Sequence, residues 1–413
     1  MVFVNLACAV QNYDWGIKGR SEVSALGALN TGVPSDASKP YAELWMGTHP
    51  SGPSVVKATG EGLREMIARD AKAHLGDVAH ARFGDDLPFL TKVLSVAKAL
   101  SIQAHPDKTL AQRLHADRPH VYKDANHKPE MTLAVTEFEA LCAFVAPEVL
   151  SANLRRVPEL RAVVGERAAA ALDAALAAAE GVVSPDGVKK ALRDVFTALM
   201  SADAEQTVTP NVRALVKRLD GESGGSASDS ASDRLAVRLD SQYPSDVGVL
   251  CAYVLNYVRL APGECIYLAA NEPHAYLSGE CVECMATSDN VVRAGLTPKL
   301  RDVDVLCGML TYQAGDPVIL KGEAADARTK TYAPPFDEFM LERIELPAGE
   351  TYELRKTQGP CVILAVEGEA KAGEVDLARG AVAYASAGEP VVVDAGAQGC
   401  ALYRAMINDR VFQ

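Results

Sequence analysis

Short runs of alternating apolar and polar residues, separated by glycine and proline, fill most of the chain on both sides of one long interruption. The runs "FLTKVLSV" (89–96) and "ALSIQAH" (99–105) precede the interruption, and "ECIYLAA" (264–270) and "CVECMA" (281–286) follow it. Successive side chains on a strand point to opposite faces, so this pattern is typical of β-strands. Their close spacing predicts antiparallel sheets folded as a sandwich or barrel.

The interruption is helical in character. It runs from about residue 147 to 220 and is rich in alanine, as in "ERAAAALDAALAAAE" (166–180). Alanine and straight-chain residues lose little entropy in a helix, and Val188, Leu192, Val195 and Leu199 form an apolar stripe at helical spacing. The next stretch, "GESGGSASDSASD", cannot bury enough apolar area to repay ordering. We therefore predict an all-helical insertion domain at 148–220 and a flexible Gly/Ser/Asp loop at 221–233.

The last ninety residues return to the β pattern. Runs such as "ERIELPAGETYEL" and "GPCVILAVEGEAKAG" are strands punctuated by tight turns, and "RLAPGECIYLAANEPHAYL" earlier in the chain has a similar cadence. This weak internal similarity favours two related β-barrels. We expect the first to be discontinuous, formed by residues 1–147 and 234–322, and the second to be formed by residues 323–413.

Composition limits the functional classes. With 48% hydrophobic and 23% charged residues, the chain is a folded globular protein, and its 413 residues predict two or three domains. The formal net charge of −13 opposes binding to nucleic acid or to an anionic membrane. No stretch approaches the roughly 18 apolar residues that span a bilayer. Nine cysteines without framework spacing fit a reducing compartment, so we expect a cytoplasmic protein.

Two pairs of potential metal ligands stand out, and one can be set aside. Cys281 and Cys284 lie three residues apart on a predicted strand, so they point to opposite faces and should not bind one ion. By contrast, Gln103 and His105 in "SIQAHPDK" share a strand face. Taken alone, however, that pair fits a hydrogen-bonded polar cluster better than a metal site.

Two further segments strengthen the metal interpretation. Glu130 in "NHKPEMTLAV" begins a predicted strand, and His274 in "NEPHAYLSG" follows a proline-led turn. With Gln103 and His105 they would supply two imidazoles, a carboxylate and an amide. Such a set leaves coordination positions open for substrate or water.

Long motifs throughout the chain resemble type I phosphomannose isomerases. They include "YAELWMGTHPSGPS", "LPFLTKVLSVAKALSIQAHPDK", "DANHKPEM", "YPSDVGVL", "LNYVRLAPGECIYLAANEPHAYLSGECVECMATSDNVVRAGLTPK" and "LYRA". The resemblance covers nearly the whole chain in order and is weakest in the helical insertion and the Ser-rich loop. It implies a mainly β fold of two cupin-type (jelly-roll) barrels with an all-helical insertion domain, the first barrel being catalytic.

The resemblance also implies an activity and its site. The family interconverts mannose 6-phosphate and fructose 6-phosphate through a cis-enediol and supplies mannose phosphates for GDP-mannose and glycoconjugate synthesis. One Zn²⁺ per chain would be held by Gln103, His105, Glu130 and His274, and the catalytic arginine matches Arg293. Redox-inert zinc suits a reaction without net electron transfer, because it can stabilise negative charge on an oxygen.

The catalytic roles follow from side-chain chemistry. A guanidinium is a poor base, so Arg293 is better suited to stabilising the enediolate or orienting O1 and O2 than to taking a proton; an ion pair with Asp289 or Glu283 is the structural alternative. Glu283, if buried on its strand, would have a raised pKa suited to acid or base chemistry. Lys128 is a further candidate for proton handling.

The substrate phosphate needs local cations in this acidic chain. Lys299 follows Thr297 and Pro298, a cap and first-turn pair that predicts a helix over "KLRDVDVLCGML", where an anion would be favoured. The resemblance adds Ser101 and Lys92 near the phosphate. Exposed lysines and a strand hydroxyl remain the structural interpretations of these three residues.

Two other functions are compatible with the residues. Two imidazoles and a carboxylate also suit Fe(II), so the barrel could be that of a cupin oxygenase. Alternatively, the protein could bind a sugar phosphate without turning it over. In either case we expect a small-molecule ligand, no nucleic acid or membrane partner, and a monomer.

Overall fold

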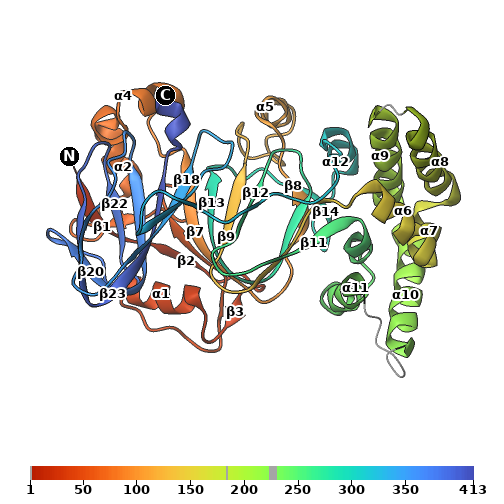
Figure 1. Ribbon diagram of the computed structural model, residues 1–413, viewed down its shortest axis with the longest axis horizontal. Helices are drawn as coiled ribbons and strands as arrows, with labels where there is room; N and C mark the ends of the chain where they lie inside the picture. The colour runs from red at the N-terminus through yellow and green to blue at the C-terminus, as the bar shows by residue number, and fades with distance from the viewer. Residues whose placement is uncertain (1, 183–184, 223–229) are drawn as a thin grey trace.

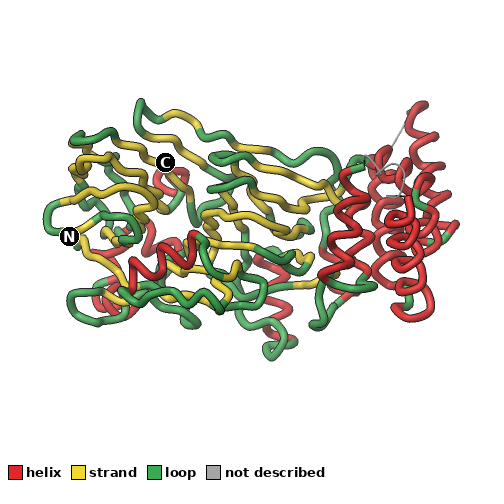
Figure 2. Tube along the Cα trace, turned by 90° about the horizontal axis from the view of Figure 1, so that it is seen from below, coloured by secondary structure: helices red, strands yellow, loops and turns green. Residues whose placement is uncertain are grey.

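The computed structural model describes residues 2–182, 185–222 and 230–413, and its parts lie in a row. Figure 1 shows helices α6–α10 at one end, a first β-sheet in the middle and a second β-sheet at the other end, where both termini lie. Figure 2 shows the same all-helical end in a perpendicular view, with further helices lying beside the strands. The predicted fold class is therefore confirmed. Among the described residues, no helix is both long and apolar enough to cross a membrane.

The first sheet has eleven strands, and all of its pairings between named strands are antiparallel. Its main path runs β15-β12-β9-β13-β7-β5-β2, with β10, β11, β8 and β14 attached through β13. These strands are β2 (Ala9–Gln11), β5 (Glu43–Met46), β7 (Phe89–Val96), β8 (Ile102–Ala104), β9 (Glu130–Ala134), β10 (Phe138–Phe144), β11 (Leu255–Leu260), β12 (Cys265–Leu268), β13 (His274–Ala286), β14 (Val292–Gly295) and β15 (Ile319–Leu320).

The second sheet has ten strands, two of which come from the N-terminal region. They are β1 (Phe3–Ala7), β6 (Val55–Val56), β16 (Glu323–Ala324), β17 (Thr329–Tyr332), β18 (Met340–Leu346), β19 (Thr351–Glu353), β20 (Cys361–Ala372), β21 (Val375–Asp376), β22 (Val382–Ala385) and β23 (Val392–Met406). A separate two-stranded ribbon pairs β3 (Ile17–Lys18) with β4 (Pro40–Tyr41). Because β1 pairs with β22, the N-terminal residues do not follow the predicted boundary between the two barrels.

The helical part is larger than its predicted range of 148–220. It contains α6 (Pro147–Arg156), α7 (Pro158–Val164), α8 (Glu166–Val182), α9 (Pro185–Ser201), a π-helical turn η1 (Ala204–Val208), α10 (Thr209–Glu222), α11 (Ala231–Gln242) and a 3₁₀ segment η2 (Val247–Tyr253). One hydrophobic cluster joins α6–α11 to η2 and to β8, β11 and β14. The helices therefore pack on the edge of the first sheet that carries Gln103.

The predicted loop at 221–233 differs from the structure at both ends. Residues 223–229 of that loop lie outside the described residues, whereas residues 221–222 end α10 and residues 231–233 begin α11. Asp233 is buried and accepts hydrogen bonds from Arg156 Nη1 and Tyr253 Oη, each at 2.8 Å. These bonds hold the first turn of α11, which the composition had assigned to the loop.

The remaining helices cover the sheets. They are α1 (Glu22–Thr31), α2 (Leu63–Arg69), α3 (Ala71–Leu75), α4 (Asp77–Phe83), α5 (Lys108–Asp117), α12 (Val303–Met309) and the C-terminal 3₁₀ turn η3 (Asp409–Phe412). The helix predicted to start after Thr297 starts only at Val303, with Asp302 as its N-cap. Thr297 Oγ1 instead accepts a hydrogen bond from the Lys299 backbone N–H in a local turn.

Both faces of the first sheet are buried at β7, which explains its apolar composition. Val93 belongs to a cluster shared with residues of the second sheet such as Leu341 and Tyr384, whereas Leu94 belongs to a separate cluster inside the first sheet. Cys281 and Cys284 divide between the same two clusters, so the predicted opposite orientation of these thiols is confirmed. Polar side chains on the inner face of such a strand need partners, and they mark the site described next.

Candidate active site

Strand β13 carries two of the predicted site residues, His274 at its start and Glu283 near its end. Between them, Gly279 has φ of +106°, and a Cβ there would lie 2.3 Å from the Glu137 carbonyl oxygen. Glycine is therefore required for β13 to continue from its pairing with β10 to its pairing with β7. This one strand links the two parts of the site.

Three predicted metal ligands converge in the interior of the first sheet. One potential ligand atom from each of His105, Glu130 and His274 lies within 4.8 Å of the others, and all three residues are buried. The Nε2 atoms of His105 and His274 each lie 3.3 Å from a different oxygen of Glu130. Two ligands about 2.1 Å from a tetrahedral ion would lie about 3.4 Å apart, so this spacing fits one common ion.

Backbone carbonyls fix the orientation of both imidazoles. His105 Nδ1 lies 2.6 Å from the Asn290 carbonyl oxygen, and His274 Nδ1 lies 3.0 Å from the Glu272 carbonyl oxygen. A carbonyl only accepts hydrogen bonds, so Nδ1 is the protonated nitrogen in each ring. Nε2 then directs its lone pair toward Glu130, an arrangement usual for histidines that bind metals.

The buried polar atoms of this cluster are short of partners, which is the test of whether they fit a cation. His105 Nε2, His274 Nε2 and Glu130 Oε2 have no hydrogen-bond partner among the described residues. Burial lowers the pKa of His105 to about 4, so its ring is neutral at pH 7 and can bind a metal. Burial alone would raise the pKa of Glu130, but Lys128 and His105 lower it well below its usual range. The donor set fits a divalent cation such as zinc.

Gln103 lies beside this cluster by strand register. On β8 it is directly opposite His274 of β13 on one side and opposite Arg293 of β14 on the other. Directly opposite residues in an antiparallel pair project to the same face, so these three side chains share a face. Ser101 Oγ donates a hydrogen bond to Gln103 Oε1 at 3.4 Å, which ties Ser101 to the amide.

A second row of polar residues crosses four neighbouring strands. Trp45 of β5 is opposite Lys92 of β7, Lys92 is opposite Glu283 of β13, and Glu283 is opposite Thr132 of β9. Lys92 Nζ lies 3.1 Å from Glu283 and 3.8 Å from Glu43, and 5.0 Å from the centroid of the Trp45 ring. Lys92 is thus buried against two carboxylates, an arrangement that composition alone did not indicate.

Burial shifts the pKa of Glu283 against the effect of the charge next to it. Burial raises the pKa of this carboxyl, while the neighbouring Lys92 opposes the rise. Burial alone would lower the pKa of Lys92, but the charges of Glu43 and Glu283 together outweigh burial and raise that pKa. Lys128 Nζ lies 3.0 Å from Glu130, which places a second lysine next to the predicted metal ligands.

Arg293 is half-buried and has no ion pair or side-chain hydrogen bond with the described residues. The structural alternative, an ion pair with Asp289 or Glu283, is therefore absent from the part of the chain that the structure describes. Asp289 instead lies 3.3 Å from His49, and Glu283 contacts Lys92. Burial lowers the pKa of Arg293.

One cavity of about 380 Å³ brings the cationic side chains together. Its lining includes Lys92, Lys128, Arg293 and Lys299, and also Glu43 and Asp289. Lys299 is exposed and lies ahead of α12, not at the helix N-terminus. The sequence interpretation missed Glu43, Trp45 and His49, although all three lie in the quoted motif "YAELWMGTHPSGPS"; a glutamate within an apolar strand was the available signal.

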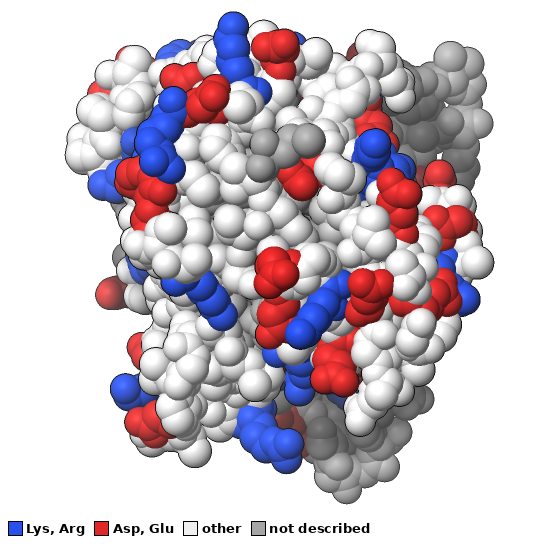
Figure 3. Space-filling model, turned by 90° about the vertical axis from the view of Figure 1, so that its left-hand side faces the viewer, with Lys and Arg blue, Asp and Glu red and all other residues white. Residues whose placement is uncertain are grey.

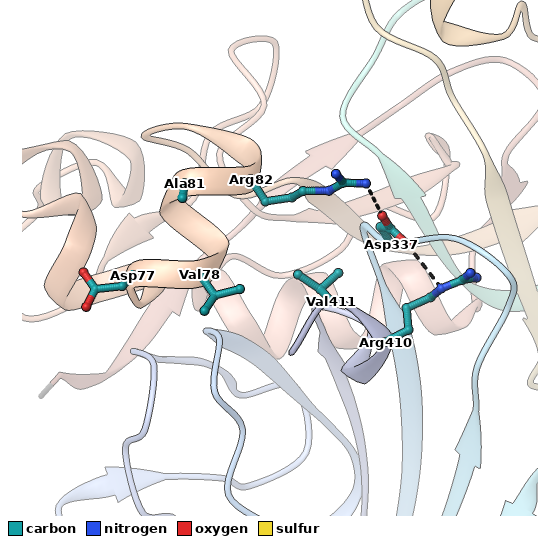
Figure 4. Close-up of a pocket in the computed structure, with 7 residues that line it drawn as sticks. All are labelled: Asp77, Val78, Ala81, Arg82, Asp337, Arg410 and Val411. Carbon is teal, nitrogen blue, oxygen red and sulfur yellow. Dashed lines mark hydrogen bonds and ion pairs between the residues drawn. The ribbon is translucent and has the colours of Figure 1, made fainter. Parts of the chain in front are cut away.

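A larger cavity of about 670 Å³ lies away from these residues. Figure 4 shows it between α4 and η3, where Arg82 and Arg410 both contact Asp337. Its arginines are about half-exposed and share one carboxylate, so it offers no buried set of donors. On the end of the molecule presented in Figure 3, basic and acidic residues are interspersed and do not form a patch of one sign.

Comparison with known families places these residues in context. Residues 3–146 match the description "Phosphomannose isomerase type I, catalytic domain", and residues 163–255 match "Phosphomannose isomerase type I, helical insertion domain". The chain is 45% identical to mannose-6-phosphate isomerase 1 of Arabidopsis thaliana over 98% of this chain and 94% of that protein. It is 40% identical to the mannose-6-phosphate isomerase of Rattus norvegicus, with 94% of each chain covered.

Solved structures give the same result. A mutant of phosphomannose isomerase from Salmonella typhimurium is 29% identical, with a TM-score of 0.82, and the match covers 98% of this chain and 99% of that one. A mannose 6-phosphate isomerase bound with zinc and yttrium matches with a TM-score of 0.81 at 29% identity and the same coverage.

Proposed function

The chain belongs to the type I phosphomannose isomerase family, and on this premise we propose that it interconverts mannose 6-phosphate and fructose 6-phosphate with one zinc ion held by Gln103, His105, Glu130 and His274. The observation that carries the proposal is the convergence of His105, Glu130 and His274, whose buried Nε2 and Oε2 atoms have no hydrogen-bond partner among the described residues. The names of the relatives and the zinc-bound neighbour support it.

The reaction moves a proton between C1 and C2 of the open-chain sugar through a cis-enediol. When bound, zinc supplies a Lewis acid that stabilises negative charge on a substrate oxygen without any redox change. Arg293 has no competing carboxylate partner among the described residues, so its guanidinium is free to hold O1 and O2 and to stabilise the enediolate. Glu283, whose pKa burial raises, is the candidate for holding a proton, and Lys128 is the second.

The lysines at the cavity differ in whether a carboxylate already neutralises them, and this difference identifies the better phosphate ligand. Lys92 faces Glu43 and Glu283, whereas Lys299 is exposed at the same cavity and has no ion pair with the described residues. We therefore assign the main phosphate contact to Lys299, with Ser101 as a hydroxyl donor. Lys92 then serves mainly to hold Glu283. The supply of mannose phosphates for GDP-mannose synthesis, a cytoplasmic location and a monomeric state remain part of the proposal.

Metal removal tests this function. After dialysis against a chelator the protein should lose turnover of mannose 6-phosphate and regain it when zinc is returned. Full turnover in protein that holds less than about one-tenth of an ion per chain would contradict the metal role, because an intact set of ligands binds its ion stoichiometrically. Iron in the isolated protein together with oxygen consumption would favour the oxygenase over the isomerase. Binding of mannose 6-phosphate without turnover would favour a sugar-phosphate-binding protein.

A further inference from the structure

Asp124 connects two chain segments of the proposed active site, one that carries Lys128 and Glu130 and one that leads to Arg293. It lies six residues before Glu130 and four before Lys128, on the segment that leads into β9. Its hydrogen-bond partners come mostly from residues 288–290, which precede Arg293 in the chain. No role for Asp124 followed from the sequence motifs, since an aspartate in a turn is commonly exposed.

The carboxylate of Asp124 accepts four hydrogen bonds. Oδ1 accepts from Ser288 Oγ at 2.9 Å, from the Asn126 backbone N–H at 2.9 Å and from Asn290 Nδ2 at 3.2 Å, and Oδ2 accepts from the Asp289 backbone N–H at 2.8 Å. Oδ1 accepts three of these bonds and Oδ2 accepts one, so both oxygens of the carboxylate are engaged. Hydrogen bonds to an ionised acceptor are stronger than neutral ones.

Asn290 extends this contact to a metal ligand. Its side-chain Nδ2 also donates to the backbone carbonyl oxygens of Asp124 at 2.7 Å and Asn126 at 2.9 Å. The backbone carbonyl of Asn290 accepts a hydrogen bond from His105 Nδ1. Asn290 is almost fully buried, with 1% of its surface exposed. The same loop therefore orients the His105 ring and leads into the strand that bears Arg293.

We propose that Asp124 is a positioning residue for the isomerisation: its carboxylate fixes the 288–290 loop and so places Arg293 in the cavity that Lys128 also lines. The inference rests on the proposed role of Arg293. Three of the four proposed zinc ligands, Gln103, Glu130 and His274, are held by sheet pairing. Arg293 also pairs with Gln103, but the loop immediately before it is held by Asp124, and the same loop orients only one ligand, His105. Loss of the carboxylate should therefore lower turnover more than it lowers metal content.

The test is a double-mutant cycle in the zinc-loaded, full-length protein. Asp124→Ala should reduce kcat about ten- to a hundredfold with KM nearly unchanged, because displacing a catalytic group by about 1 Å can cost that much. Asp124→Asn keeps one acceptor oxygen and should retain more activity than Asp124→Ala. Asp117→Ala is the matched control, since Asp117 is exposed at the end of α5, and it should retain wild-type kcat.

Measuring the effect of Asp124→Ala in the Arg293→Ala variant distinguishes the positioning of Arg293 from a general loss of folded protein. If Asp124 acts through Arg293, Asp124→Ala should change kcat less than about twofold in that background, because residues that act as a unit are not additive. An equal loss in both backgrounds, or wild-type kcat in Asp124→Ala, would overturn the proposal. Ser288→Ala, which removes one bond to Asp124, can replace Asp124→Ala in the cycle if that variant does not fold. Full activity of Arg293→Ala alone would instead contradict the proposed function.

Discussion

At the scale of single residues, each histidine of the proposed metal site offers only one nitrogen, because a backbone carbonyl occupies the other. Replacing His274 removes one of the three buried donors of the proposed site. We expect His274→Ala to lose zinc and turnover together, as measured by metal analysis and a mannose 6-phosphate assay on the same sample. The exposed His120 provides the control, and His120→Ala should keep both. Retention of zinc by His274→Ala would remove His274 from the site.

Arg293 should behave in the opposite way. Its guanidinium is not tied to a carboxylate among the described residues, so the fold does not depend on it. Arg293→Ala should retain one zinc ion and the wild-type melting temperature while kcat falls by about a hundredfold or more, the size expected for losing a group that stabilises developing charge. Arg167→Ala, on the exposed face of α8, should have no effect. Zinc loss in Arg293→Ala would show that the arginine has a structural role.

Sequence reasoning reached the candidate ligands but not the charges around them. Gln103, His105, Glu130 and His274 could be proposed because each residue type suits a metal and each lies in a long family motif. The burial of Lys92 between Glu43 and Glu283 could not, because their contact depends on strand register between β5, β7 and β13. The register between strands depends on matching the hydrophobic patterns of both strands, so for strands far apart in the sequence no single segment reveals it.

At the scale of elements, Glu139 ties α11 to the first sheet. It lies on β10 and accepts hydrogen bonds from Ser278 of β13, Tyr257 of β11 and Arg238 of α11. Burial raises the pKa of Glu139, but these three donors outweigh it and the net pKa lies below its usual value. A carboxyl with a lowered native pKa stabilises the fold above its unfolded-state pKa, and this contribution disappears as the pH falls through the native pKa.

Glu139→Gln should therefore destabilise the protein at pH 7 by about 2 kcal/mol, the cost of weakening hydrogen bonds to a charged group. Thermal unfolding of both proteins at several pH values measures this difference, which should shrink as the pH drops below about 4. Glu137→Gln on the same segment is the control, because Glu137 is exposed. A difference that does not depend on pH would mean that the charge of Glu139 is not what stabilises the contact.

Element types were predictable where the local pattern was strong. The alanine-rich stretch became α8, and the stripe residues Leu192, Val195 and Leu199 of α9 are buried as the spacing predicts. The predicted start of the helix after Thr297 was wrong, because threonine and proline form a simple turn there. Asp302, five residues later, provides the better N-cap. The sequence offers two possible N-cap residues in this segment, and the surrounding structure determines which of them begins the helix.

At the scale of the whole molecule, the two sheets cannot be separated by a single cut. Strand β1 belongs to the second sheet, where Phe3, Val4, Asn5 and Leu6 pair with β22, and one hydrophobic cluster is shared by both sheets. Alternating patterns identified the strands but not which sheet each one joins, because β1 and β22 are far apart in the sequence. This long-range pairing is why the predicted boundary missed the N-terminal strand.

This arrangement predicts how fragments behave. Residues 1–322 alone should aggregate, because β1 and the shared cluster would be exposed to water. Co-expressed with residues 323–413, the fragment should form a complex that co-purifies and regains isomerase activity. Size-exclusion chromatography and turnover assays measure both outcomes. A monodisperse, fully active fragment 1–322 would show that the second sheet is dispensable.

The central claim is that four side chains distant in sequence bind one zinc ion beside Arg293. Diffraction data collected on both sides of the zinc absorption edge, from crystals grown with fructose 6-phosphate, test it most directly. The account predicts a single anomalous peak about 2.0–2.2 Å from His105 Nε2, His274 Nε2 and a Glu130 oxygen, with the Gln103 amide oxygen also bound. A zinc peak elsewhere, or none in crystals of active enzyme, would contradict it.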